Sequence, residues 1–161
     1  MDTDDFRRLA LRPALIHLGL WSRAAEDLLL GTALAESGGL RWLAQRGGGP
    51  CDGGGPALGF FQIEPATHDD VWRNYLAYRS ELAAKTAALA APSPDRTAQL
   101  ATNLRYAAAI ARLIYRRVAA PLPITLAARA GYWKAHYNTA AGAGATEHFI
   151  AAWRAAFPQG D

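Results

Sequence analysis

The chain is poor in the features that anchor a protein in a membrane or hold it together with disulfides. Its 161 residues contain one cysteine, Cys51, which excludes an intramolecular disulfide. No apolar run approaches the length of a membrane span, so membrane insertion is not expected. Residues 1–5 are acidic and lack the basic start and apolar core of a signal peptide. We therefore expect synthesis in the cytoplasm without a signal peptide.

Residues that favour β-strands are also scarce. β-Branched side chains are few, and the alternation of apolar and polar residues that marks a strand is almost absent. Alanine dominates, followed by leucine and arginine, and hydrophobic residues make up 51% of the chain. This composition predicts an all-α fold, and the length fits one domain over residues 1–161 with a core of its own.

Concentrated charge and metal-ligand spacings are lacking as well. The net charge is +3, but the basic residues are spread along the chain, so nucleic-acid binding is not expected as the main function. The four histidines, His17, His68, His136 and His148, are not spaced as metal ligands. We expect neither a metal nor another cofactor.

The apolar spacing predicts a series of helices interrupted by one glycine-rich segment. Residues 46–56 contain six glycines and two prolines and should form an irregular loop or a small β-hairpin. The strongest helical pattern follows Ser93 and Pro94, which suit an N-cap and a first helical residue, and continues to Val118. This segment is expected to be the long central helix. Other helices are expected at about residues 5–19, 22–36, 65–78, 79–90, 124–136 and 145–156.

Glu36 closes one of these helices and is the most informative residue of the chain. Helical geometry places Leu29, Leu28 and Ala25, which lie seven, eight and eleven residues earlier, on the same face. A carboxyl group beside an apolar stripe is costly to ionise, so its pKa should rise toward the range that a general acid needs. The alternative is a glutamate that bends away from the helix end into solvent.

Three later segments carry further polar and turn residues. They are Leu58-Gly59-Phe60-Phe61-Gln62-Ile63-Glu64-Pro65-Ala66-Thr67, Asn103-Leu104 and Tyr137-Asn138-Thr139-Ala140-Ala141-Gly142. Together with Ala35-Glu36-Ser37-Gly38, their order and spacing resemble the motifs of the lytic transglycosylase group of lysozyme-like proteins. The resemblance covers roughly residues 28–142. The chain departs from the family pattern at Phe60, Phe61, Ala107, His136 and the inserted Thr139.

The resemblance implies a lysozyme-like, two-lobed fold with a groove, and it assigns roles to individual residues. Glu36 would be the catalytic acid at the centre of the groove. Substrate-binding roles would fall to Ser37, Gly59, Gln62, Tyr137 and Asn138. The amides of Gln62 and Asn138 suit N-acetyl and hydroxyl groups, although either could instead cap a helix or brace a turn. Asn103 is expected to brace a loop rather than contact sugar.

The implied activity is cleavage of the β-1,4 bond between N-acetylmuramic acid and N-acetylglucosamine in peptidoglycan. A lytic transglycosylase needs one glutamate, which protonates the leaving oxygen and then deprotonates the 6-hydroxyl that closes a 1,6-anhydro sugar. Asp52 and Glu64 are candidate second carboxylates and leave a lysozyme-type hydrolase open as an alternative. The other alternative is a non-catalytic cell-wall-binding or virion structural protein that keeps the fold.

The small size and the N-terminal sequence suggest a setting for this activity. We expect a phage or prophage product, either an endolysin that reaches the cell wall after holin action or a part of the virion. The expected partners are peptidoglycan glycan strands, with other virion proteins as further candidates. The chain is expected to be a monomer.

Overall fold

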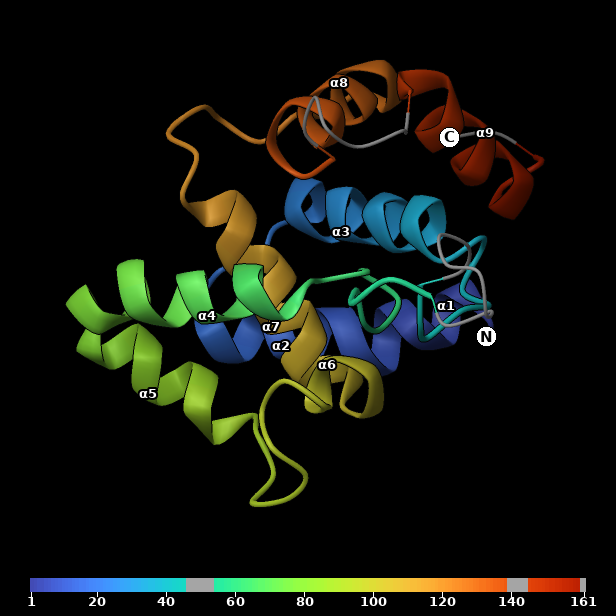
Figure 1. The fold of residues 1–161 in the computed structure, drawn as a ribbon. Helices are drawn as coiled ribbons and strands as arrows, with labels where there is room; N and C mark the ends of the chain where they lie inside the picture. Colours follow the sequence, from blue (N-terminus) through green and yellow to red (C-terminus); the bar gives the residue numbers. More distant parts are fainter. Residues whose placement is uncertain (46–53, 139–144, 160–161) are drawn as a thin grey trace.

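The computed structural model describes residues 1–45, 54–138 and 145–159 of the chain. These residues fold into stacked helices, which confirms the predicted all-α class (Figure 1). None of the described helices is long and apolar enough to cross a membrane. The helices are α1 (Thr3–Phe6), the π-helix η1 (Arg7–Leu11), α2 (Arg12–Leu18), α3 (Arg23–Glu36), α4 (Pro65–Asn74), the 3-10 helix η2 (Leu76–Tyr78), α5 (Ser80–Ala88), α6 (Gln99–Thr102), α7 (Leu104–Arg116), α8 (Leu126–His136) and α9 (Thr146–Ala156).

Helix α3 lies in the middle of the stack (Figure 1). Every residue from Ala25 to Ala35 is buried, because α8 and α9 pack on one side and η1 and α7 on the other. A helix that is apolar around most of its circumference has to be enclosed in this way. Ser22 is its N-cap, as predicted, and its hydroxyl oxygen accepts the backbone N–H of Ala25 at 3.1 Å. The C-terminal end of α3, which carries Glu36, is therefore held between two layers of helices.

The strongest predicted helix is interrupted at Asn103, which separates α6 from α7. The Asn103 side chain accepts the backbone N–H of Tyr106 at 3.1 Å and donates to the carbonyl of Leu89 at 2.8 Å. Asn103 thus caps α7 and ties it to the end of α5, which confirms the expected bracing role. The long central helix of the prediction is shorter than expected, and it shares the interior with α3.

The predicted helix start at Ser93 and Pro94 is wrong. Both residues lie in an irregular segment before α6. The buried side chain of Gln99 explains this, because its amide donates to the carbonyls of Ala91 and Pro94 at 2.9 and 2.7 Å and accepts the Ala91 N–H at 2.8 Å. These hydrogen bonds satisfy backbone groups of the segment without a helix.

The glycine-rich segment is held together at its two ends. Ala44 and Leu58 form an isolated antiparallel bridge, and Leu58 forms a second bridge with Ile63. The Gly59 N–H also donates to the carbonyl of Leu43 at 2.9 Å. Residues 46–53 of the expected loop or hairpin, with the candidate Asp52 among them, lie outside the described residues.

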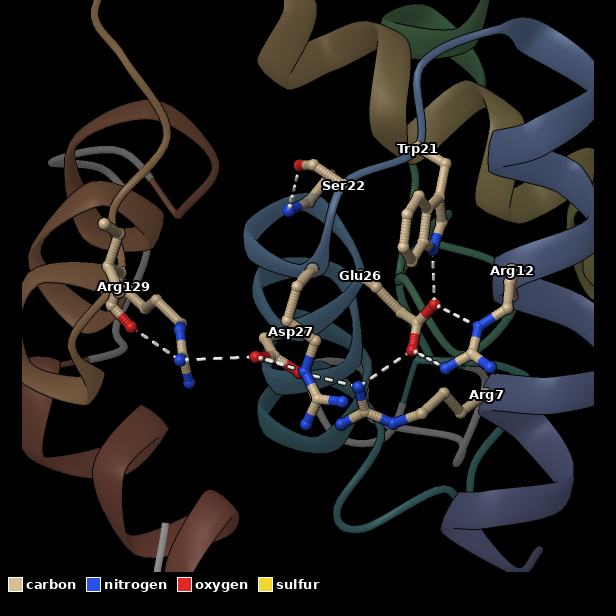
Figure 2. A network of polar contacts seen from close by, with 10 residues as sticks. Arg7, Arg12, Trp21, Ser22, Glu26, Asp27 and Arg129 are labelled. Carbon is tan, nitrogen blue, oxygen red and sulfur yellow. Dashed lines mark hydrogen bonds and ion pairs between the residues drawn. The ribbon is translucent and has the colours of Figure 1, made fainter.

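A network of buried ion pairs joins the N-terminal helix to α3 (Figure 2). The Glu26 side chain is fully buried and accepts hydrogen bonds from Arg7 Nη1 at 2.9 Å, from Arg12 Nε and Nη2 at 2.8 Å each and from Trp21 Nε1 at 2.8 Å. Burial alone would raise the pKa of Glu26. The hydrogen bonds from Arg12, Trp21 and Arg7 outweigh it and lower the pKa to about 2. Glu26 therefore stays ionised inside the protein.

The neighbouring carboxylate of Asp27 extends the network to α8. Asp27 accepts from Arg7 Nη1 at 2.6 Å, from Arg23 Nε at 3.0 Å and from Arg129 Nη2 at 3.4 Å. Arg129 belongs to α8, so Asp27 connects α3 with the layer above it (Figure 2). Arg7 contacts both Glu26 and Asp27, and the two acids of α3 thus share one buried cation.

The α3–α9 contact depends on a glycine, Gly31, which has no side chain. A Cβ atom added at Gly31 of α3 would lie 2.2 Å from Cζ of Phe149, a fully buried residue of α9. Gly31 therefore provides the space into which the Phe149 ring packs. Gly131 of α8 offers a contrast, because a Cβ added there meets no atom within 4 Å.

We expect Glu26→Gln to lower the free energy of unfolding at pH 7 by about 3–5 kcal/mol, since it leaves Arg7 and Arg12 without their shared carboxylate. The contribution of a carboxylate with a lowered pKa is present above its ordinary value of 4.5 and is lost as the pH falls toward about 2. The difference between the two proteins in urea unfolding should shrink over that range. Asp5→Asn removes an exposed pair with Arg8 and should change little.

The two glycine-to-alanine substitutions should act in opposite directions. Gly31→Ala should destabilise the protein by about 1–3 kcal/mol, because the methyl group overlaps the Phe149 ring. Gly131→Ala should stabilise it by about 0.5–1 kcal/mol, because alanine loses less backbone entropy in an open helical position. Thermal unfolding of both variants tests this packing, and an equal response from the two would contradict it.

Candidate functional site

The chain turns sharply directly after Glu36. Ser37 is fully buried, and its hydroxyl donates to the carbonyl of Ala33 at 2.6 Å and accepts the N–H of Leu40 at 3.0 Å. Gly38 and Gly39 follow with φ angles of +62° and +79°, a conformation that glycine adopts without strain. Both bonds of Ser37 lie inside this turn. Its placement therefore favours a structural role over the substrate contact that the resemblance implies.

The Glu36 carboxyl group lies in a partly buried position against α8. Trp133 Nε1 donates to Glu36 Oε1 at 2.8 Å, and the Asn138 side chain makes a further hydrogen bond with the carboxyl group. Burial raises the pKa of Glu36 above its ordinary value, and the hydrogen bonds from Trp133 and Asn138 and the nearby His148 oppose this rise in part. The alternative of a glutamate fully turned into solvent does not hold.

Two tyrosines form an aromatic wall next to Glu36. The rings of Tyr115 and Tyr137 are stacked with centroids 5.2 Å apart. The Tyr115 hydroxyl is 2.7 Å from the hydroxyl of Thr32, and the Tyr137 hydroxyl donates to the carbonyl of Phe61 at 2.8 Å. Burial raises the pKa of both phenols well above the usual value, and the charge of Glu36 raises it further. Both tyrosines are therefore fixed, neutral neighbours of the carboxyl group.

The Gly59–Gln62 turn contacts this wall, because the carbonyl of Phe61 within the turn accepts the Tyr137 hydroxyl. Gly59 has a φ of +74°, and a Cβ there would lie 1.9 Å from the carbonyl oxygen of Leu100. Gln62 has a φ of +46°, and its Nε2 donates to the carbonyl of Gly59 at 2.8 Å. Gly59 thus allows the turn to approach α6 closely, and Gln62 braces it. Among the described residues, Gln62 Oε1 has no hydrogen-bond donor and remains available to a ligand.

A cleft of about 340 Å³ lies between this turn and α8. It brings together residues from α4, α7, α8 and the turn that are far apart in the sequence. Tyr137 lines the cleft, whereas Glu36 is not among its described lining residues; the charge of Glu36 contributes to the raised pKa of Tyr137. The lining residues are Gln62, Ile63, Glu64, Thr67, Ile114, His136 and Tyr137. Of the predicted site residues, Gln62, Glu64 and Tyr137 thus line the cleft. Asn138 lies beside the Glu36 carboxyl group.

Glu64 stands in an exposed position at the start of α4. It is the N-cap of that helix, but its side chain makes no capping hydrogen bond. Its carboxyl group lines the same cleft as Gln62 and Tyr137 and has no ion pair among the described residues. Among the candidate second carboxylates, Glu64 is the one that the described structure places beside the cleft.

Two neighbours of Glu36 were not singled out by the sequence. Trp133 is almost fully buried in α8, and its indole N–H is directed at the carboxyl group. His148 of α9 hydrogen-bonds through Nε2 to the carbonyl of Ala35 at 2.8 Å, and a carbonyl can only accept, so this nitrogen carries a proton. Each residue reaches Glu36 only because α8 and α9 pack on α3. Local sequence patterns contain no signal for such contacts.

No group of three or more side chains able to hold a metal ion is found among the described residues. No protein-family model, curated protein or solved structure matches the chain. The functional argument for Glu36 therefore depends on its burial, its hydrogen bonds and the cleft beside it.

Replacing Glu36 with glutamine should make the protein more stable at neutral pH. A carboxyl group whose pKa is raised on folding keeps its proton more tightly in the folded state, so its ionisation destabilises the fold as the pH rises above 4.5. The amide can still accept the Trp133 hydrogen bond and carries no charge. Urea unfolding should show the stabilisation at pH 7 and little of it near pH 4.

The exposed Glu147→Gln variant controls for the loss of a surface carboxylate in the same experiment. If Glu36→Gln were less stable than the wild type by the same amount at both pH values, the raised pKa of Glu36 would be refuted.

Proposed function

We propose that this protein cleaves the β-1,4 bond between N-acetylmuramic acid and N-acetylglucosamine in peptidoglycan as a lytic transglycosylase. The observation that carries the proposal is the Glu36 carboxyl group, partly buried at a helix end with a raised pKa and neutral hydrogen-bond donors. A carboxyl group with a raised pKa holds its proton to a higher pH, and it can then protonate the leaving oxygen of a glycosidic bond. The arrangement around it supports each further step.

Glu36 would act first as an acid and then as a base. Its proton passes to the glycosidic oxygen as the C1–O4 bond breaks, and the carboxylate then accepts the proton of the 6-hydroxyl as O6 bonds to C1. The product is a 1,6-anhydro sugar, and no water is consumed. Trp133 and Asn138 would stabilise the carboxylate between the two steps, since both hydrogen bonds favour the ionised form.

The cleft next to Tyr137 would hold the glycan. Gln62 Oε1 and the hydroxyl of Thr67 are polar groups suited to N-acetyl and hydroxyl groups, and Ile63 and Ile114 supply apolar surface for the sugar rings. Helices α8 and α9 lie on one side of α3, and α4 and α5 lie beyond its other side (Figure 1). This arrangement supports a lysozyme-like, two-lobed fold in which the cleft is part of the groove.

Glu64 supports a second candidate, a lysozyme-type hydrolase. It lines the same cleft with a free carboxyl group, which could activate a water molecule or stabilise the positively charged sugar. The two reactions differ in their products, because hydrolysis leaves a reducing end and transglycosylation leaves the anhydro sugar. A phage or prophage origin, action on the cell wall and a monomeric state remain parts of the same proposal.

Digestion of purified peptidoglycan followed by mass spectrometry tests the function. We expect the wild type to release 1,6-anhydro products and Glu36→Gln to lose about 10²–10⁴-fold in rate, the usual contribution of a general acid. Glu64→Gln and Asp52→Asn serve as matched carboxylate controls and should keep most of the activity.

Other outcomes are equally informative. Products with reducing ends, lost in Glu64→Gln or Asp52→Asn, would establish the hydrolase instead. If the wild type cleaved no peptidoglycan but bound it as tightly as Glu36→Gln, the protein would be a non-catalytic wall-binding or virion component.

A further inference from the structure

A second cavity, of about 230 Å³, lies at the end of α7. It is formed where the last turns of α7, the segment after it and Tyr132 of α8 come together. Two arginines and no acidic side chain are found among the described residues that line it. The lining residues are Arg112, Tyr115, Arg116, Val118, Ala119, Ala120, Pro121, Leu122 and Tyr132.

Arg112 is a buried cation for which the described residues supply no carboxylate partner. The residue is 7% exposed, and among the described residues its guanidinium makes a single hydrogen bond, from Nε to the carbonyl of Leu20 at 3.5 Å. That distance is at the limit of a hydrogen bond. Nη1 and Nη2 have no acceptor in the described part of the chain. Buried charges in proteins are normally paired, because an unpaired buried charge destabilises the fold.

The neighbouring charges increase this cost. Arg116 lies one turn further along α7, and like charges four residues apart on a helix repel each other. Burial lowers the pKa of Arg112, and the positive charge of Arg116 lowers it further. Arg116 also has no ion pair among the described residues. The helix dipole favours a cation in the last turn of α7, but the effect fades beyond that turn and does not account for Arg112.

The polar groups next to Arg112 do not compensate its charge. The Tyr132 hydroxyl donates to the carbonyl of Ala120 at 3.2 Å, and the Tyr115 hydroxyl is engaged with Thr32. Both are neutral phenols with raised pKa values. The pairing that Glu26 supplies to Arg7 and Arg12 elsewhere in the protein is thus lacking here, although the cavity offers room for an external acceptor.

We propose that this cavity binds an oxyanion, a carboxylate or phosphate group, between the guanidinium groups of Arg112 and Arg116. The planar guanidinium matches both anions with two parallel hydrogen bonds. The site is separate from the cleft beside Glu36, although Tyr132 at the cavity contacts His136 at the cleft with ring centroids 4.5 Å apart. The proposal does not depend on the cleavage reaction proposed for Glu36.

Thermal unfolding in increasing phosphate or acetate, compared with sodium chloride at the same ionic strength, tests the site. Binding to the folded state raises the melting temperature in a saturable way, so we expect phosphate, acetate or both to stabilise the wild type beyond chloride. A response to acetate alone identifies a carboxylate site, and a response to phosphate alone identifies a phosphate site.

Three variants localise the effect. Arg112→Met replaces the buried cation with an apolar side chain, so we expect it to melt at a higher temperature than the wild type in chloride and to lose the anion response. Arg116→Gln keeps the buried arginine, and we expect its anion affinity in calorimetric titration to fall by about ten-fold, the loss of one charge-assisted hydrogen bond. Arg154→Gln, an exposed position on α9, controls for net charge and should bind like the wild type.

Two results would overturn the proposal. One is an equal response of the wild type, Arg112→Met and Arg116→Gln to phosphate and acetate, which would mean that the anions act elsewhere. The other is a wild type that neither anion stabilises beyond chloride.

Discussion

The pairing of two buried carboxylates with arginines from other helices sets the positions of the elements around α3. Glu26 and Asp27 cannot remain ionised in the interior unless cations reach them, and the cations come from η1, α2 and α8. Arg129 of α8 reaches Asp27, and Trp133, one turn further along α8, reaches Glu36. The contact between α3 and α8 thus pairs Asp27 with Arg129, and it also places the Trp133 indole next to the Glu36 carboxyl group.

Helix α3 holds a fully buried glutamate and a partly buried one, and their pKa values move in opposite directions. Glu26, near the N-terminus of the helix, is surrounded by guanidinium groups and an indole N–H, and its pKa falls to about 2. Glu36, at the C-terminus, is raised in pKa by burial, because its neutral donors and the nearby histidine oppose that rise only in part. The helix dipole reinforces both shifts, since it favours an anion at the start of the helix and disfavours one at the end. One helix can therefore fix its neighbours with one carboxylate and bind a proton more tightly on the other.

Local patterns in the sequence account for much of the fold. The bounds of α3, α8 and α9, the Ser22 cap and the apolar face beside Glu36 follow from spacing and capping rules that act within a few residues. The break at Asn103 depends on that residue's own hydrogen bonds to Tyr106 and Leu89. The irregular segment before α6 depends on the side chain of Gln99, whose hydrogen bonds span up to eight residues. Such contacts are not contained in helical periodicity.

The candidate site divides in the same way. Glu36 could be identified from its own helix, but the role of Trp133 depends on how α8 packs on α3, which the sequence alone does not specify. Gln62 and Tyr137 were grouped only through the family resemblance, and the structure places both at one cleft. The unpaired Arg112 gave no signal at all, because a buried cation in an amphipathic helix looks like any other arginine until its neighbours are known.

The π turn η1 in the N-terminal helix places two arginines of the charge network on the same side of that helix. The Arg12 N–H bonds to the carbonyl of Arg7, five residues earlier. In a regular α-helix, side chains five residues apart point in directions about 140° apart, whereas a π turn brings them to one side. Both arginines reach Glu26 from that side. A regular α-helix over the same residues would keep every arginine and still separate the pair, so the network depends on the π turn as much as on its charges.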